Sequence, residues 1–455
     1  MRGSNNARKK TKYVFKKGYI ILIIAMAVIT LLVTFLTSFF ETEQYPVPDI
    51  ESPPESPPSV IIETPVDIND EAAPDAIEEP ELPPEDTIIS INEIYPEFLV
   101  IMDYFSKRYT TSALSFVLYD SELSEFYVYQ YGFRDYSTNK PVDLDTKFCV
   151  ASLSKLVTAI CAMTLVEDEI LDLDKDISEY LGYEVRNPHF PDTAITTGML
   201  LRHTSSIFDP GEYIYAENKD SPEATQRLLE SGKCFLELQP GSEYNYSPFL
   251  AYSVVALICE IITEKRFDTI AREALFVPMG IDAAYLPANL LNTDNIAAIY
   301  SSPNELLYSI EDQLETEDPE SPRISDHDRA GANLMISAID YTKIIDMLCN
   351  RGVYKDINIL SEESVIEVHR TINRENDSGI GMGVFFQSDR SHPFSGYYYH
   401  IGSAWGAQAL FQYFFDENTS RSYVILATGT NSDWASDYHS LHLELSIAAM
   451  QFFIW

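Results

Sequence analysis

The chain has 455 residues and a formal net charge of −39 at pH 7, with 70 acidic and 31 basic residues. This balance argues against a nucleic-acid partner, which would require a basic face. The length suits one large domain or two ordinary ones. The five cysteines show neither a disulfide framework nor zinc-site spacing, and we expect them to fill the core.

The first forty residues predict a membrane anchor. Residues 1–17 are basic and contain no acidic side chain, and residues 18–40 form an uncharged, mostly apolar run. That run can cross a bilayer, since a transmembrane helix needs roughly 20 residues, and it ends without the small-residue cleavage site of a signal peptide. Because basic flanks stay inside, we expect a cytoplasmic tail, a single-pass anchor in the cell membrane and an extracellular remainder after Glu41.

Residues 41–90 predict a disordered linker. They combine many prolines with Asp and Glu and contain no Lys or Arg. Such a segment cannot bury enough apolar area to fold, and its like charges repel each other. At about 3.1 Å per residue, an extended spacer of this length reaches up to about 150 Å. We therefore expect a tether that holds the following domain away from the membrane.

Residues 91–455 have the mixed composition of a globular domain. Apolar spacing predicts helices over residues 93–108 and 251–262, whereas residues 300–328 are polar and without a pattern, which predicts a long surface loop. The segments that predict strands are 113–119, 125–131, 379–387, 397–403, 407–415 and 422–428, followed by a last helix over 436–453. Strands at both ends with helices between them favour one α+β domain whose sheet combines both ends of the chain.

A serine and a lysine three residues apart, Ser152 and Lys155, stand where a helical pattern begins. Positions i and i+3 share one face of a helix, so the hydroxyl and the amine can meet. A serine hydroxyl needs an adjacent base to become a nucleophile, and a desolvated lysine can serve as that base. A second such pair, Ser137 and Lys140, lies among turn residues that predict no helix. His203 has two interpretations: it is a catalytic residue, or it bonds to nearby backbone, which is the more common role of a histidine.

Further motifs accompany this pair in the segments 132–155, 200–205, 240–247, 275–280, 329–332 and 400–402. In this order they resemble the serine β-lactamase and penicillin-binding-protein superfamily, especially its class C-like branch of D-aminopeptidases, carboxypeptidases and esterases. The resemblance covers residues 91–455. It implies a β-lactamase/transpeptidase-like fold, in which an antiparallel sheet is flanked by terminal helices and joined by a helical subdomain. It implies no cofactor and no metal.

The resemblance also implies roles for particular residues. Ser152 would be the acylated nucleophile, Lys155 its proton partner, and Tyr246 a proton shuttle whose pKa a nearby ammonium would lower. The backbone N–H groups of Ser152 and Ser403 would form the oxyanion hole. The substrate and oxyanion positions, on a strand at the edge of the site, would be His400, Gly402 and Ser403.

Two positions depart from the family pattern. Pro248 stands where the family has an asparagine, and proline has no side-chain amide to offer. His400 stands where β-lactamases usually have lysine, and a histidine is mostly neutral at pH 7, which weakens recognition of a carboxylate. Both departures favour esterase or peptidase chemistry, or lost activity, over β-lactam hydrolysis.

Two hypotheses follow from the sequence. The first is a membrane-tethered, extracytoplasmic serine hydrolase that acts through an acyl-enzyme on ester or D-amino-acid amide substrates, for which cell-wall polymers are a natural source. The alternative is a catalytically impaired β-lactamase-fold protein that binds or scaffolds at the cell envelope. Acylation of Ser152 would distinguish the two.

Overall fold

The computed structural model describes residues 86–91, 96–211, 221–303, 305–314, 325–372, 378–388, 396–416, 419–435 and 438–450. The chain divides into two units, residues 1–80 and 81–455, and the described residues all belong to the second. The predicted tail and anchor, and most of the predicted linker, lie outside the described residues and stay predictions. Within the described ranges, none of the helices has the length and apolar character needed to span a bilayer.

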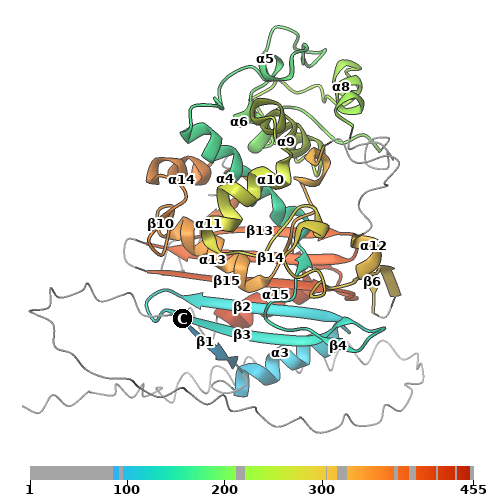
Figure 1. The fold of residues 1–455 in the computed structure, drawn as a ribbon, viewed down its shortest axis with the longest axis vertical. Helices are drawn as coiled ribbons and strands as arrows, with labels where there is room; N and C mark the ends of the chain where they lie inside the picture. The colour runs from blue at the N-terminus through green and yellow to red at the C-terminus, as the bar shows by residue number, and fades with distance from the viewer. Residues whose placement is uncertain are drawn as a thin grey trace, which may run out of the picture. The chain divides into compact units, whose positions relative to one another are not determined.

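A nine-stranded sheet organises the folded unit (Figure 1). Its strands follow the order β1-β3-β2-β15-β14-β13-β12-β11, with β4 beside β3. β1 is parallel to β3 and the other pairs are antiparallel, so the sheet is mixed. The strands are β1 (Thr87–Ser90), β2 (Ala113–Asp120), β3 (Glu125–Asp135), β4 (Lys140–Pro141), β11 (Ser378–Ile380), β12 (Phe385–Ser388), β13 (Gly396–Ala404), β14 (Ala407–Phe415) and β15 (Ser420–Thr428).

The sheet joins the two ends of the domain at its middle. β2 pairs with β15, for example Val117 with Val424, although about three hundred residues separate them in the chain. The prediction that both ends contribute to one sheet is therefore confirmed. The register is specified because side chains alternate between two buried faces, and a slip by one residue would exchange them.

Helices cover both faces of the sheet. On one face, Phe116 and Leu118 of β2 pack in a cluster with Phe98 of α3 (Pro96–Arg108) and with Leu441 of α15 (Ser440–Ala449). On the other face, Val117 belongs to the large core that includes α13 (Ala338–Cys349) and α4 (Ser154–Glu167). Burying each of these side chains contributes roughly 1.5–3 kcal/mol, and the alternation supplies both cores from the same strands.

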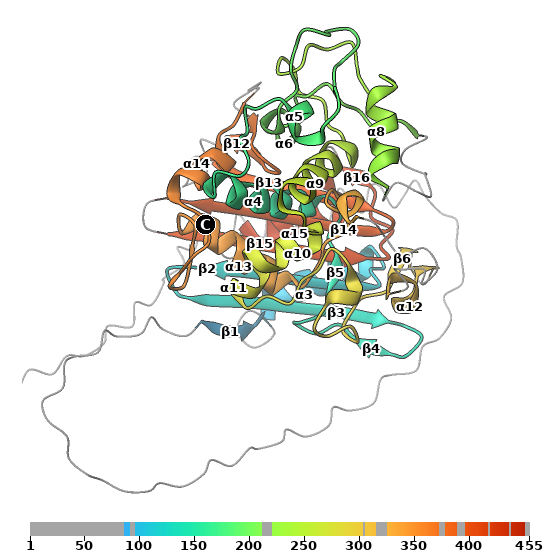
Figure 2. The ribbon, with the colours of Figure 1, turned by 45° about the horizontal axis from the view of Figure 1, so that its top comes forward.

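A helical subdomain lies beyond α4 and α9 (Leu250–Thr263), on the side away from the sheet (Figures 1 and 2). The helix predicted over 251–262 is thus confirmed. The remaining helices are α5 (Ile177–Leu181), α6 (Thr197–Leu201), α8 (Pro222–Glu230), α10 (Phe267–Ala271), α11 (Val277–Met279), α12 (Ile310–Leu314) and α14 (Glu362–His369), with the short turns η1 (Ala151–Leu153), η2 (Arg272–Phe276), η3 (Pro287–Asn289) and η4 (His327–Arg329). Four two-stranded ribbons pair β5 (Phe148–Cys149) with β8 (Met335–Ile336), β6 (Ile299–Ser302) with β7 (Glu305–Tyr308), β9 (Val353–Tyr354) with β10 (Ile357–Asn358), and β16 (Trp434–Ala435) with β17 (Tyr438–His439).

Several predicted elements differ from the structure. The strand predicted over 379–387 is two antiparallel strands, β11 and β12, because the chain turns at Gly383, whose φ is +67°. The loop predicted over 300–328 contains β7 and α12. The last helix begins at Ser440, after β17, and the predicted linker ends earlier than residue 90, since Thr87–Ser90 form β1. The predicted antiparallel sheet is mixed because that added strand is parallel.

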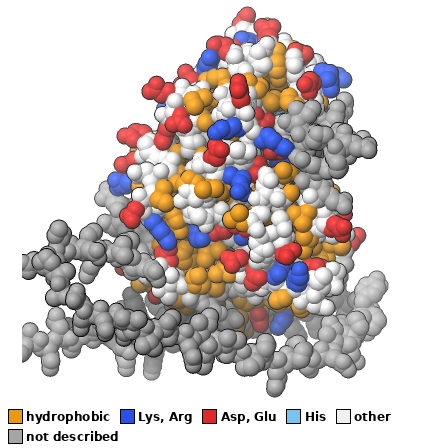
Figure 3. Space-filling model, in the orientation of Figure 1, with side chains coloured by type: hydrophobic (Ala, Val, Ile, Leu, Met, Phe, Trp, Pro, Cys, Tyr) orange, Lys and Arg blue, Asp and Glu red, His pale blue; other side chains and the backbone are white. Residues whose placement is uncertain are grey.

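Four of the five cysteines lie in the core, as the sequence predicts. None of the five cysteines is in a disulfide, and Cys149, Cys161, Cys234 and Cys259 are buried. On the face shown in Figure 3, Lys and Arg side chains are interspersed with acidic and apolar ones, so the described part of that face carries no continuous basic patch.

Candidate active site

The backbone around Ser152 is held in a strained turn. Ser152 lies in η1, directly before α4, so the predicted helical pair spans a 3₁₀ turn and the first turn of an α-helix. Ala151 has a φ of +46°, a conformation that residues with side chains rarely adopt. The turn is fixed by the Tyr341 hydroxyl, which donates to Leu153 O at 2.8 Å, and by Ser154 Oγ, which donates to Ala151 O at 2.6 Å. One long-range and one local hydrogen bond thus hold the Ser152 backbone in place.

Lys155 meets Ser152 as the spacing predicts. Its Nζ donates to Ser152 Oγ at 3.1 Å, to Pro248 O at 2.7 Å and to Gly331 O at 2.8 Å. The two carbonyls come from segments far along the chain. In the neutral amine, the two N–H groups can stay on the carbonyls, and the lone pair then faces the Ser152 hydroxyl. This is the orientation a general base requires.

The environment of Lys155 favours that neutral form. The side chain is completely buried, and burial lowers its pKa to about 7, although the negative charge of Asp209 opposes this effect. An ammonium and an amine are therefore both populated near neutral pH. Lysines with such a pKa are common among catalytic bases.

Tyr246 completes the contacts of the Ser152 hydroxyl. Its hydroxyl donates to Ser152 Oγ at 2.8 Å, and Lys155 Nζ lies 5.2 Å from the centre of its ring. The expectation of a lowered pKa is wrong, because burial raises the pKa of Tyr246 above its ordinary value of 10. Tyr246 is therefore a protonated phenol near neutral pH, and it can act as a proton donor.

The resemblance implies two contacts for the missing asparagine, one with Lys155 and one with the amide carbonyl of a substrate, and Pro248 keeps the first. Its backbone carbonyl accepts a hydrogen bond from Lys155, so the lysine keeps an acceptor at this position. Pro248 itself offers no side-chain donor in place of the amide. The segment is held by Asp209, whose carboxylate accepts from Ser247 Oγ at 2.5 Å and from Phe249 N and Leu250 N at 3.0 and 2.8 Å. Asp209 thereby also caps the N-terminal end of α9.

His203 bonds to nearby backbone, which is one of the two interpretations that the sequence left open. Its Nδ1 accepts from Ser247 N at 3.2 Å, and its ring packs 4.5 Å from the ring of Tyr246. Burial and the nearby Lys155 charge lower the pKa of His203 well below its usual value. A histidine that hardly accepts a proton is a poor base, so we assign it to positioning the segment that carries Tyr246.

Strand β13, which lies between β14 and β12 in the sheet, brings the predicted oxyanion and substrate positions against η1. A Cβ on Gly402 would lie 2.4 Å from Val150 O, so only glycine lets the strand approach this closely. Ser403 follows Gly402 on the strand, and its Oγ lies 3.0 Å from His439 Nε2. His400 Nδ1 donates to Ile401 O at 2.8 Å, and burial together with the Lys155 charge lowers the pKa of His400 to about 3.

A cavity of about 560 Å³ opens beside the Ser152 hydroxyl. Most of its lining side chains are aromatic or apolar. They are Ser152, Tyr244, Tyr246, Pro248, Phe249, Ala332, Phe385, Tyr399, His400, Ile401, Ser403 and Ala404. The structure therefore brings four of the six predicted site residues, Ser152, Tyr246, His400 and Ser403, to one cavity. The other two lie next to these residues: Lys155 contacts Ser152, and Gly402 precedes Ser403 on β13. Within the described ranges, no three His, Cys, Asp or Glu side chains are arranged to hold a metal ion.

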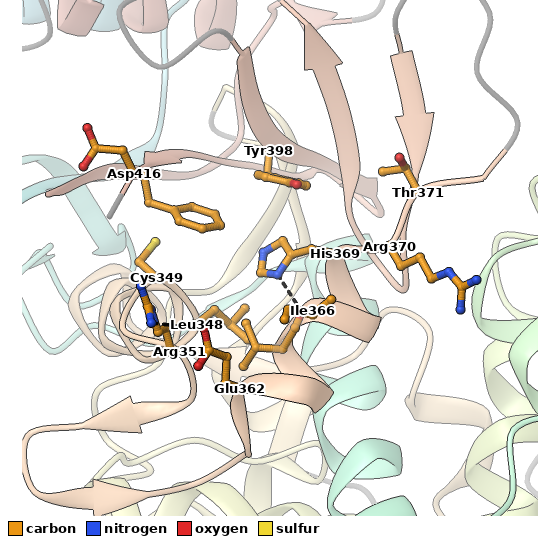
Figure 4. Close-up of a pocket in the computed structure, with 12 residues that line it drawn as sticks. Leu348, Cys349, Arg351, Glu362, Ile366, His369, Arg370, Thr371, Tyr398 and Asp416 are labelled. Atoms are coloured by element: carbon orange, nitrogen blue, oxygen red, sulfur yellow. Dashed lines mark hydrogen bonds and ion pairs between the residues drawn. The ribbon is translucent and has the colours of Figure 1, made fainter. Parts of the chain in front are cut away.

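A larger cavity, of about 680 Å³, lies between α13, α14 and the ends of β13 and β14 (Figure 4). There His369 donates from Nδ1 to Val365 O at 2.8 Å and accepts at Nε2 from the Tyr413 hydroxyl at 2.6 Å. Burial lowers the pKa of His369 to about 4 and raises that of the Cys349 thiol. Figure 4 shows Arg370 directed away from His369. The described residues that line this larger cavity include no nucleophile in contact with a base. We therefore assign the chemistry to the smaller cavity beside Ser152.

The comparison with known families agrees with this geometry. A sequence model described as Beta-lactamase matches residues 107–445. The chain belongs to the beta-lactamase family. The matched region includes Ser152, Lys155, Tyr246 and the β13 positions.

Individual members of the beta-lactamase family are distant from this chain. A D-alanyl-D-alanine-carboxypeptidase/endopeptidase, AmpH, of Escherichia coli is 24% identical over 241 residues, which cover 47% of this chain and 62% of that protein. A lovastatin esterase of Penicillium rubens is 29% identical over 168 residues, covering 32% of this chain and 42% of the esterase. The chain thus spans less than two thirds of the length of these curated relatives.

Solved structures show the same fold. The octameric penicillin-binding protein homologue from Pyrococcus abyssi superposes with a TM-score of 0.62 at 17% identity, covering 79% of this chain and 77% of that one. The D-amino acid amidase from Ochrobactrum anthropi SV3 has a TM-score of 0.59 at 19% identity, covering 79% and 99%. At such identities the likeness establishes the β-lactamase/transpeptidase fold alone.

Sequence reasoning missed two contributors to the site. Asp209 and the carbonyl of Gly331 both act on Lys155, one by its charge and one by a hydrogen bond. The turn signal of Asp209-Pro210-Gly211 marks a loop, but no local pattern indicates which helix that loop caps. A backbone carbonyl carries no signature in the sequence at all.

Proposed function

We propose that the protein is a membrane-tethered, extracytoplasmic serine hydrolase that acts through an acyl-enzyme on ester or D-amino-acid amide substrates. One observation carries this proposal. The Ser152 hydroxyl is contacted by a buried lysine, whose pKa is about 7, and by a protonated tyrosine, at 3.1 and 2.8 Å. A nucleophile with both a base and an acid in contact is the arrangement that acyl transfer needs.

Acylation would proceed as follows. Neutral Lys155 takes the proton of the Ser152 hydroxyl while Oγ bonds to the substrate carbonyl carbon. The carbonyl oxygen becomes an oxyanion, which the backbone N–H groups of Ser152 and Ser403 stabilise, and Gly402 permits this close approach. When the bond to the leaving group breaks, Tyr246 and Lys155 together return the proton to the departing oxygen or nitrogen. The acyl group remains on Ser152.

Deacylation repeats these steps with water. A water molecule loses a proton to the Lys155 and Tyr246 pair, attacks the acyl carbon and releases the acid product. The proton then returns to Ser152 Oγ, which restores the free enzyme. Esters and amides are the substrate classes because family relatives are named as an esterase, a carboxypeptidase and an amidase. Cell-wall peptides or esters suit the proposed extracellular place.

The membrane tether and the extracellular location are part of this proposal. They rest on the apolar run over residues 18–40 and its basic flank. Added protease on intact cells should remove the domain from the surface and leave residues 1–17 protected. Protection of the whole chain would contradict the proposed orientation.

The catalytic proposal is tested on the full chain in detergent. It is incubated with a fluorophosphonate probe and with short p-nitrophenyl esters, and its intact mass is recorded. We expect one label and nitrophenol release in the parent, both lost in Ser152→Ala and both kept in Ser137→Ala, the serine of the second pair. A folded parent that takes no label and releases no nitrophenol would contradict the proposal.

The alternative function is a binding or scaffold protein of the cell envelope. Pro248 favours it, because no side-chain donor stands where the family has an amide. The hydrogen bond from Lys155 to the Pro248 carbonyl favours the hydrolase, since it keeps the lysine oriented. Absence of acylation in the experiment above would leave the binding protein as the better function.

A further inference from the structure

The cavity beside Ser152 has an aromatic wall built from separate elements. Tyr244, from the segment before α9, meets Phe385 of β12 edge to face, with ring centres 6.4 Å apart. Phe385 in turn lies 5.6 Å from Tyr399 of β13. Phe249 also lines the cavity, and its ring centre lies 5.8 Å from that of Trp405. Aromatic surfaces of this kind favour apolar and aromatic ligand groups.

Among the described residues that line this cavity, none offers an available cation. Among its lining residues only His400 could carry a positive charge, and its pKa of about 3 keeps it neutral. The Lys155 nitrogen lies beneath the cavity, and its hydrogen bonds are committed to Ser152 Oγ and two backbone carbonyls. A carboxylate that entered would lose its hydration without gaining an ionic partner, which is strongly unfavourable.

Two polar side chains on β13, Ser403 and His400, present acceptors to a ligand. His439 Nδ1 lies 3.3 Å from Ser432 O, and a carbonyl only accepts, so Nδ1 carries the proton. The neutral ring then accepts at Nε2 from the Ser403 hydroxyl at 3.0 Å, which leaves lone pairs on Ser403 Oγ. His400 donates from Nδ1 to Ile401 O, so its other nitrogen is an acceptor as well. Such groups repel a carboxylate and suit an N–H or O–H.

We propose that this cavity takes an uncharged substrate group, aromatic or branched aliphatic, next to the scissile bond and discriminates against substrates with a free carboxylate there. This rests on the proposed function, because it names the substrate class of the same Ser152 site. Neutral esters and amides, in which N–H groups meet the acceptors and apolar groups meet the aromatic wall, fit best. Peptides that end in a carboxylate beside the scissile bond fit poorly.

The test separates binding from turnover. The full-length Ser152→Ala chain in detergent is titrated calorimetrically with N-acetyl-D-phenylalaninamide and with N-acetyl-D-phenylalanine. These two ligands differ in an amide against a carboxylate. We expect the amide to bind at least tenfold more tightly at pH 7. Equal affinities, tighter binding of the acid, or no binding of the amide would overturn the inference.

A second variant places a cation in the cavity. His400→Lys in the same background should reduce the preference for the amide to less than threefold, because the carboxylate gains an ionic partner. His189→Lys makes the same change at an exposed position and should leave the preference as it was. Should His400→Lys fail to fold, the exposed Ser403→Lys adds a cation at the same cavity. An unchanged preference in the folded cavity variant would contradict the inference.

The outcomes distinguish this inference from the proposed function. A parent chain that takes no acyl label, while the Ser152→Ala chain prefers the amide, would refute the hydrolase and keep the cavity's selectivity. A parent chain that is acylated, while the variant binds both ligands equally, would keep the hydrolase and refute the selectivity.

Discussion

The pKa of Lys155 predicts how acylation of Ser152 depends on pH. A lysine with its ordinary pKa of 10.5 would be neutral in roughly one molecule in three thousand at pH 7. With a pKa of about 7, half of the molecules hold the neutral amine that can accept the Ser152 proton. Burial thus increases the population of the active base by about a thousandfold. The acylation rate should rise with pH, pass its midpoint near pH 7 and level off above pH 8.

The assay is the rate of fluorophosphonate labelling of the full chain between pH 5 and pH 10, followed by intact mass. Lys155→Met should lower the plateau by about 10²–10⁴-fold, the usual contribution of a general base, and remove the step near pH 7. Lys140→Met changes the lysine of the second pair and should leave both unchanged. A midpoint near 10 in the parent, or a step that survives in Lys155→Met, would refute the assignment of Lys155 as the base.

Three further changes test other parts of the site. Tyr246→Phe removes the acid in contact with Ser152 and should lower ester turnover by about 10²–10⁴-fold, measured by nitrophenol release, while circular dichroism stays as in the parent. Gly402→Ala places a Cβ 2.4 Å from a backbone carbonyl and should destabilise the fold by about 1–3 kcal/mol in chemical denaturation, whereas Gly211→Ala, which meets no atom within 4 Å, should not. The folded-state pKa of Lys155 lies below its unfolded value, so the unfolded state binds more protons between pH 7 and pH 10.5 and the parent gains stability as pH rises through that range. Relative to Lys155→Met, the gain should reach about 5 kcal/mol, and a flat difference between the two unfolding free energies would contradict the shift.

At Pro248 the family's sequence motif is broken, but the contact with Lys155 is kept. From the sequence, the loss of the asparagine removes a side chain that would contact Lys155. In the structure the backbone carbonyl of the same residue makes a 2.7 Å contact with the lysine nitrogen. What Pro248 lacks is the N–H donor of the asparagine side chain. The departure therefore bears on substrate binding more than on the orientation of the base, which agrees with a cavity that selects neutral groups.

The sequence by itself determined the local features of this protein. The three-residue spacing of Ser152 and Lys155 places both on one face, and the structure brings their side chains to 3.1 Å. Residues 113–119 predict a strand, and the structure has β2 there, with side chains that belong to two different buried clusters. The second Ser-Lys pair was correctly assigned to a turn, since Asn139 there has a φ of +53°. Each of these depends on neighbours within a few residues.

Only the tertiary structure decided what these groups can do. The pKa of Lys155 depends on complete burial and on the charge of Asp209, and its orientation depends on carbonyls 93 and 176 residues away. The same burial raises the pKa of Tyr246, opposite to the prediction from its charged neighbour alone. Desolvation is a property of everything packed around a group. It has no local pattern, and it sets which side chain at this site accepts a proton and which one donates it.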